Sequence, residues 1–156
     1  MANVGLVDQD ISRTFALLGG SATIGEPAET ALAAHDLLLR GLPAATLLYL
    51  TSRVAFLNDD KGLDKAVGIS VRTLQRRKND APDTVLSVEQ SNRTWKFAAI
   101  LGRASEIFGS LQAAENWMNE PAIGLDQRKP IDLLATSVGV EAVTDYLTRI
   151  DYGVYV

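Results

Sequence analysis

Four cations within seven positions give the strongest chemical signal in this chain. Residues 68–78 read Gly-Ile-Ser-Val-Arg-Thr-Leu-Gln-Arg-Arg-Lys. Arginine grips phosphates or makes a bidentate contact to guanine, and threonine reaches either the DNA backbone or a base edge. The segment therefore favours a helix that reads DNA.

The faces of this helix follow from where it begins. Gly68 suits the left-handed turn that ends a preceding helix, and Ser70 can cap the next one. If the helix begins at Val71, the 100° step per residue turns Val71 and Leu74 toward a core. The opposite side then carries Arg72, Thr73, Arg76 and Arg77. The DNA-binding candidates are Ser70, Arg72, Thr73, Gln75, Arg76, Arg77 and Lys78. The alternative interpretation is an ordinary solvated face on a helix of an unrelated bundle.

The segment upstream supplies the other parts of a helix-turn-helix domain. After Gly41-Leu42-Pro43, the spacing of apolar residues predicts an amphipathic helix over residues 44–57. Its apolar positions are Leu47, Leu50, Val54 and Leu57. Residues 58–60 break this helix, and a short helix over 61–67 leads into Gly68. Asp64 departs from the pattern, because such domains usually pack a small apolar residue at that position.

The charge distribution separates two parts of the molecule. The net charge is −4 and the isoelectric point is about 4.9. Residues 35–79 nevertheless hold eight Lys/Arg and four Asp, a balance of +4, whereas residues 1–34 carry −3 and residues 80–156 carry −5. A local positive face suits phosphate binding, and an acidic remainder limits indiscriminate DNA binding and suits a protein partner.

Composition limits the remaining classes of function. The chain has 156 residues, 47% of them apolar, which is enough for a core. It has no cysteine and no apolar run long enough to span a bilayer, so we expect a cytoplasmic protein without a membrane association. His35 is the single histidine, and no nucleophile or carboxylate pair forms a recognisable motif. We expect no catalytic residues, no metal site and no cofactor, so the chain is not predicted to be an enzyme.

The amino-terminal segment gives few clues to function. Residues 4–18 are compatible with a helix, and residues 19–27 indicate a flexible loop before a helix over 28–40. The loop has the glycine spacing of a phosphate-binding loop, but Glu26 and Pro27 replace the required Lys and Ser/Thr.

Beyond residue 85 the chain predicts a small helical bundle. Ser87 and Gln90 form a capping box for a long helix that runs to about Phe108. A helix capped by Ser110 follows, then one that begins at Ile131 and ends at Gly139, and a last one that closes near Ile150. Trp95 points away from the apolar stripe of the long helix, either covering the helix-turn-helix domain or lying in an oligomer interface. The fold class is therefore all-α, divided into an amino-terminal arm with a lead-in helix (1–34), a helix-turn-helix domain (35–84) and a helical bundle with a tail (85–156).

Several motifs of this bundle carry a family resemblance. They are Ala114-Glu115-Asn116-Trp117-Met118, Pro130-Ile131-Asp132-Leu133-Leu134, a later single glycine, and Arg149-Ile150-Asp151-Tyr152-Gly153-Val154-Tyr155. Together with Gly41-Leu42-Pro43 and Arg72-Thr73-Leu74-Gln75-Arg76-Arg77, they resemble the Xre/MbcA/ParS-type antitoxins with a C-terminal toxin-binding domain. The likeness covers residues 36–156 in order, and its ending is most similar to the Xre antitoxins paired with RES-domain toxins. Met118 stands where the family commonly has leucine.

The resemblance implies a function with two partners. The antitoxin of such a type II toxin–antitoxin system binds and neutralises a RES-domain toxin that degrades NAD⁺, and antitoxin or complex represses its own operon at operator DNA. A homodimer or a larger hetero-oligomer with the toxin is expected. The toxin-binding candidates are Trp117, Arg149, Tyr152, Gly153, Val154, Tyr155 and Val156. The tyrosines suit a protein interface, although terminal aromatics also fold back onto a bundle. The alternative function is a helix-turn-helix repressor whose helical domain, walled by Trp95 and Trp117, senses a small ligand.

Overall fold

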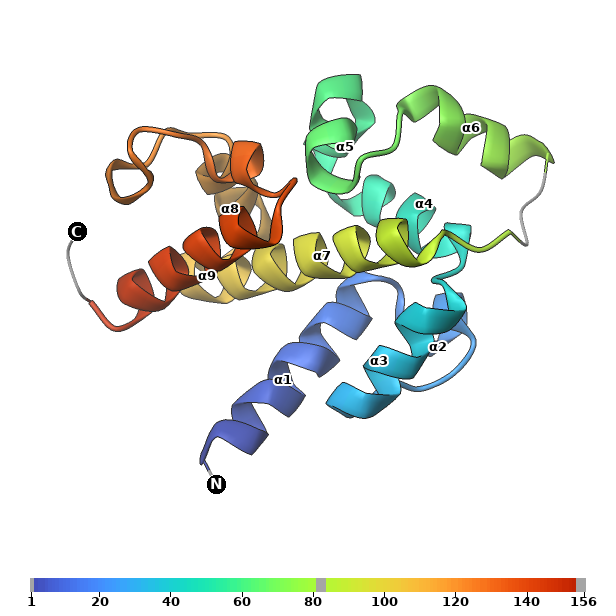
Figure 1. The fold of residues 1–156 in the computed structure, drawn as a ribbon, viewed down its shortest axis with the longest axis horizontal. Helices are drawn as coiled ribbons and strands as arrows, with labels where there is room; N and C mark the ends of the chain where they lie inside the picture. The colour runs from blue at the N-terminus through green and yellow to red at the C-terminus, as the bar shows by residue number, and fades with distance from the viewer. Residues whose placement is uncertain (1, 81–83, 154–156) are drawn as a thin grey trace.

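The computed structural model describes residues 2–80 and 84–153, and this part of the chain is helical, without a β-strand (Figure 1). The expected all-α fold, a helix-turn-helix unit followed by a helical bundle, is confirmed. In chain order the elements are α1 (Ala2–Leu17), α2 (Gly20–Ile24), α3 (Ala31–Arg40), α4 (Ala44–Arg53), the 3₁₀ helix η1 (Ala55–Asn58), α5 (Asp60–Val67), α6 (Val71–Asp80), α7 (Val88–Phe108), α8 (Leu111–Met118), the 3₁₀ helices η2 (Ile123–Leu125) and η3 (Pro130–Leu133), and α9 (Ser137–Asp151).

Helix α7 runs through the middle of the molecule, and the other elements pack around it (Figure 1). Helices α4 to α6 lie over its amino-terminal half, α8 and α9 lie toward its carboxy-terminal half, and α1 and α3 cover the opposite side. The predicted capping box is present, because Ser87 and Gln90 each bond the other's backbone N–H. Phe97 and Leu101 are buried along the stripe, and Trp95 is half-buried against the same core.

The predicted helix over 44–57 is divided in two. The four predicted apolar positions, Leu47, Leu50, Val54 and Leu57, are buried. However, α4 ends at Arg53, Val54 is extended, and a 3₁₀ turn follows. The amide of Asn58 stabilises the division by donating to the carbonyls of Thr51 (3.2 Å) and Ala55 (3.3 Å), which a continuous helix would have used internally. A side chain outside the apolar pattern therefore decides where the helix stops.

The amino-terminal segment is more ordered than its sequence indicates. The expected loop over 19–27 contains the short helix α2, and Leu18, Ile24 and Ala28 belong to the core. Helix α3 begins at Ala31 rather than at residue 28, because the Thr30 hydroxyl accepts from the N–H of Ala33. The predicted division of the chain at residue 34 falls inside this helix, and the three-part division stays a prediction.

The predicted helix end at Gly139 is wrong. Residues 130–133 form only the 3₁₀ turn η3, and Gly139 lies in the first turn of α9. Thr136 caps α9 by accepting from the N–H of Gly139 at 3.0 Å. The glycine was expected to stop a helix, but the threonine three residues earlier starts one.

Candidate DNA-reading helix and partner-binding surface

The turn between α5 and α6 is built as its sequence predicts. Gly68 is left-handed with φ 75°, and its N–H donates to the carbonyl of Asp64 at 2.8 Å. The Ser70 hydroxyl accepts from the N–H of Thr73 at 3.1 Å and donates to the hydroxyl of Thr73 at 2.9 Å. Asp60, at the start of α5, adds a second cap by accepting from the N–H of Val71 at 3.1 Å. The hydroxyls of Ser70 and Thr73 are thus engaged in holding the start of α6.

Packing fixes which side of α6 faces outward. Leu74 is buried and Val71 is half-buried against the core, as the helical step predicts. Arg72 and Arg76 are exposed on the far side, where neither forms a hydrogen bond or ion pair with the residues described. Asp64 is also exposed, so its departure from the usual small apolar residue leaves the packing of the corner intact. Two unpaired arginines one helical turn apart form the most available cationic surface of α6.

Arg77 lies in a different environment from its two neighbouring arginines. It is half-buried, and its guanidinium donates to the carbonyl of Val85 at 3.2 Å. The segment around Val85 is tied in turn to the start of α4, because the N–H of Leu86 donates to the carbonyl of Leu42 at 2.7 Å. Arg77 therefore ties α6 to the segment at Val85 as well as adding positive charge.

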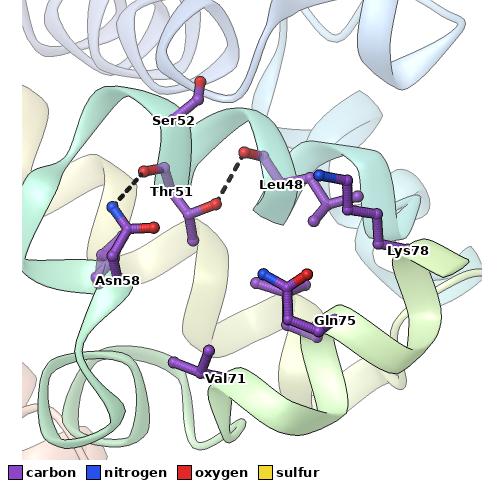
Figure 2. A pocket seen from close by; sticks show the side chains of 9 residues that line it. Leu48, Thr51, Ser52, Asn58, Val71, Gln75 and Lys78 are labelled. Atoms are coloured by element: carbon purple, nitrogen blue, oxygen red, sulfur yellow. Dashed lines mark hydrogen bonds between the residues drawn. The ribbon is translucent and has the colours of Figure 1, made fainter.

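Gln75 and Lys78 lie on the flank of α6 that faces α4. Figure 2 shows them at the edge of a groove of about 290 Å³ between these two helices. The groove is lined by Leu48, Thr51, Ser52, Leu57, Asn58, Val71, Leu74, Gln75 and Lys78. Both side chains are nevertheless exposed. The helical step places Gln75 about 60° around the helix from Arg72, and Lys78 about 120° from it, nearer the buried face. Contact of Gln75 and Lys78 with DNA stays a prediction.

Two side-chain contacts that the sequence did not single out help to connect the helix-turn-helix unit (α4 to α6) to the rest of the molecule. Arg93 of α7 donates to the carbonyls of Lys65 (2.9 Å) and Asp64 (3.4 Å) at the end of α5. Its Nε is buried and has no hydrogen-bond partner among the described residues. The ammonium of Lys65 pairs with Asp132 of η3 at 2.6 Å. The cation next to a helix carboxy terminus is favourable because the carbonyl ends carry partial negative charge.

The toxin-binding candidate Trp117 is part of an aromatic stack. Its ring lies 5.5 Å from that of Phe108 and 6.4 Å from that of Tyr146, the second pair being nearly parallel at 10°. Trp117 is half-buried in this stack. The space beside it is filled by other rings, which disfavours the ligand pocket walled by two tryptophans.

The other toxin-binding candidates lie at the end of α9. Arg149 and Tyr152 are exposed, and Gly153 is left-handed with φ 72°. The N–H of Tyr152 donates to the carbonyl of Thr148 at 3.0 Å, so the last turn of α9 holds this tyrosine in place. Val154, Tyr155 and Val156 lie outside the described residues.

The bundle that contains these residues matches a known family. Residues 103–153 match the family model described as the antitoxin Xre/MbcA/ParS C-terminal toxin-binding domain. The resemblance to the Xre/MbcA/ParS-type antitoxins is confirmed. No described helix is both long enough and apolar enough to cross a membrane.

Three curated proteins resemble this chain, and each carries the name Antitoxin Xre. The protein of Yersinia enterocolitica is 35% identical over 92 residues, covering 58% of this chain and 61% of its own length. That of Photorhabdus laumondii is 26% identical over 133 residues, covering 85% and 87%, respectively. That of Pseudomonas putida is 28% identical over 120 residues, covering 76% and 71%. Their shared name agrees with the expectation that this chain is not an enzyme.

Proposed function

We propose that this chain is the antitoxin of a type II toxin–antitoxin system, with α6 reading operator DNA and the carboxy-terminal bundle holding the toxin. The match of residues 103–153 to a toxin-binding domain carries the proposal. It is supported by the exposed arginines of α6, which stand on a separate part of the same molecule.

The partner that we propose is a RES-domain toxin that degrades NAD⁺. The support is the ending of the chain, Arg149 to Tyr155, which resembles the antitoxins of such toxins. Arg149 and Tyr152 are exposed at this end. They suit a protein partner, since arginine and tyrosine are enriched among the residues that contribute most of the binding free energy at protein interfaces.

We also propose that the chain represses its own operon. One recognition helix covers only a few base pairs, so a dimer or larger assembly on an inverted repeat is required for a specific site. The start of α6 is held by two caps, from Ser70 and Asp60, which fix the backbone from which the Arg72 side chain projects.

Co-expression tests the proposal. A RES-domain toxin from the same genome is expressed alone and beside this chain, and growth and cellular NAD⁺ are followed. We expect the toxin alone to arrest growth and deplete NAD⁺, the pair to grow normally, and the two proteins to purify together. Depletion of NAD⁺ that continues beside the full-length chain would contradict the toxin assignment. A mobility-shift titration with the DNA upstream of the operon tests repression separately.

A further inference from the structure

The loop after α8 holds a single, tightly bonded conformation. Its two ends pair as an antiparallel bridge between Ala122 and Arg128, with Ala122 N–H donating to Arg128 O at 3.1 Å. Inside the bridge, Gln127 N–H donates to Ala122 O at 2.9 Å. Asp126 and Gln127 have φ of 54° and 64°, and they are the two residues other than glycine with positive φ in the described chain. Such backbone conformations are unfavourable and persist only where the surroundings fix them.

The loop is also fixed to the bundle beneath it. Leu125 is buried in the core, and Gly124 lies so close to the ring of Tyr146 that any Cβ at this position would collide with it. Tyr146 in turn stacks on Trp117. The ring of Tyr146 therefore holds the loop at a fixed distance from α9, and Trp117 holds that ring in place.

This rigid loop presents a large apolar side chain to solvent. Ile123 is 72% exposed although it stands between the buried Ala122 and the closely packed Gly124. A single exposed isoleucine is ordinary on a protein surface. An exposed isoleucine on a loop that is held by backbone hydrogen bonds is different, because a partner that covers it gains apolar burial with little ordering of the chain.

We propose that Ile123 is an anchor that the toxin buries, so that this loop forms a second contact surface in addition to the end of α9. The inference rests on the proposed antitoxin function. Two observations favour the toxin as the occupant. Ile123 lies within the residues that match a toxin-binding domain, and the coil that follows α8 stands at the same end of the molecule as the carboxy terminus of α9 (Figure 1). Trp117 and Tyr146 are then positioning residues, which hold the loop rather than meet the toxin.

Matched serine substitutions test the anchor. Ile123→Ser and Val138→Ser remove apolar side chains of nearly equal exposure, 72% and 74%, from the same domain. Binding of each full-length variant to purified toxin is measured by surface plasmon resonance. We expect Ile123→Ser to weaken binding about tenfold or more, mainly through faster dissociation, and Val138→Ser to stay within about twofold of the parent. The inference is overturned if Ile123→Ser weakens binding no more than Val138→Ser does.

A second variant tests the position of the loop while leaving Ile123 in the chain. Gly124→Ala must displace the loop from Tyr146, so we expect it to weaken toxin binding by a similar factor. Thermal unfolding and operator binding of the same variant confirm that it is folded, and unchanged toxin affinity would contradict a role for the fixed loop. If the parent protein itself fails to bind the toxin, the proposed function fails; if the parent binds and Ile123→Ser behaves as Val138→Ser does, only the anchor is wrong.

Discussion

The cations of α6 differ in what surrounds them. Arg72 and Arg76 project outward without a partner among the described residues, Arg77 is bonded to the carbonyl of Val85, and Lys78 borders the groove beneath the helix. A free guanidinium can orient itself on a base or a phosphate, whereas one that already serves a carbonyl must give up that bond first. The contribution of each cation to DNA binding is therefore expected to follow its environment.

Alanine substitutions at Arg72 and Arg76 should weaken operator binding by about 1 to 3 kcal/mol each if the residue reads a guanine. A base reader loses preference at one position of the operator, whereas a phosphate contact weakens all sequences alike and lowers the salt slope by about one. Mobility-shift titrations at several salt concentrations separate the two roles. Arg128→Ala, which removes an exposed arginine from the distant loop, is the matched control. Parent-like binding by both α6 variants would exclude this helix as the reader.

Arg93→Ala should lower the free energy of unfolding by about 1 to 2 kcal/mol, because it removes charged hydrogen bonds to the carbonyls that end α5. Asp132→Asn removes the ion pair with Lys65, whose side chain is 43% exposed against 40% for Asp132, and should change stability by less than about 1 kcal/mol. Urea unfolding of both variants measures the difference. A larger loss for Asp132→Asn would show that the surface pair, and not Arg93, secures α5.

At the scale of the elements, α5 lies very close to η1 within the helix-turn-helix unit. Gly62 is buried in α5, and a Cβ there would collide with the carbonyl of Phe56 in η1. Backbone atoms of a short 3₁₀ turn have little room to move. The spacing of these two elements thus depends on the absence of one methyl group.

Gly62→Ala should destabilise the protein by about 1 to 3 kcal/mol, even though alanine is the better helix former by about 1 kcal/mol. Gly102→Ala in α7 is the matched helical control. There the nearest atom is Cδ of Arg13 at 3.1 Å, which belongs to a long side chain and not to the backbone, so a shift of a few tenths of an ångström relieves the contact and we expect a change near zero. Thermal unfolding of the two variants measures the difference in stability. Equal losses of stability would refute the prediction.

At the scale of the whole molecule, α6 and the end of α9 lie on different parts of the fold (Figure 1), so a mutation at one proposed surface should leave the other intact. A variant ending at Asp151 lacks Tyr152 and the residues beyond it but keeps α9. Two buried tyrosines at an interface are worth about 2 kcal/mol each or more, so their loss should weaken the toxin complex several hundred-fold if the contributions add.

The truncated variant should therefore fail to protect cells from the toxin while binding operator DNA as the parent does. Growth and cellular NAD⁺ are followed in cells that express both proteins, and DNA binding is measured on the purified variant. Full protection would place the toxin contact on the bundle instead of the tail. Joint loss of protection and DNA binding would mean that the tyrosines stabilise the fold.

The sequence predicted elements whose ends are set by local chemistry. The caps at Ser70, Ser87 and Ser110 are present because a hydroxyl and the N–H three residues later meet in any helix of this kind. It did not predict the break at Val54, which depends on Asn58 reaching back to carbonyls, nor the contact of Arg93 with α5. Ile123 was missed for the same reason. Its exposure depends on a loop whose conformation is fixed by residues distant in sequence, such as Tyr146.

Helix α7 joins the proposed DNA-reading end to the proposed toxin-binding end without an intervening loop. Its 21 residues span about 30 Å. A continuous helix fixes both the distance and the angle between its two ends. Each added residue would extend it by about 1.5 Å and turn its far end by about 100° relative to the near end. A toxin held at the far end would thus stand at one distance and one angle from the operator. A single-residue insertion would also turn buried residues such as Phe97 or Leu101 out of the core, so the fold itself keeps this distance and angle constant.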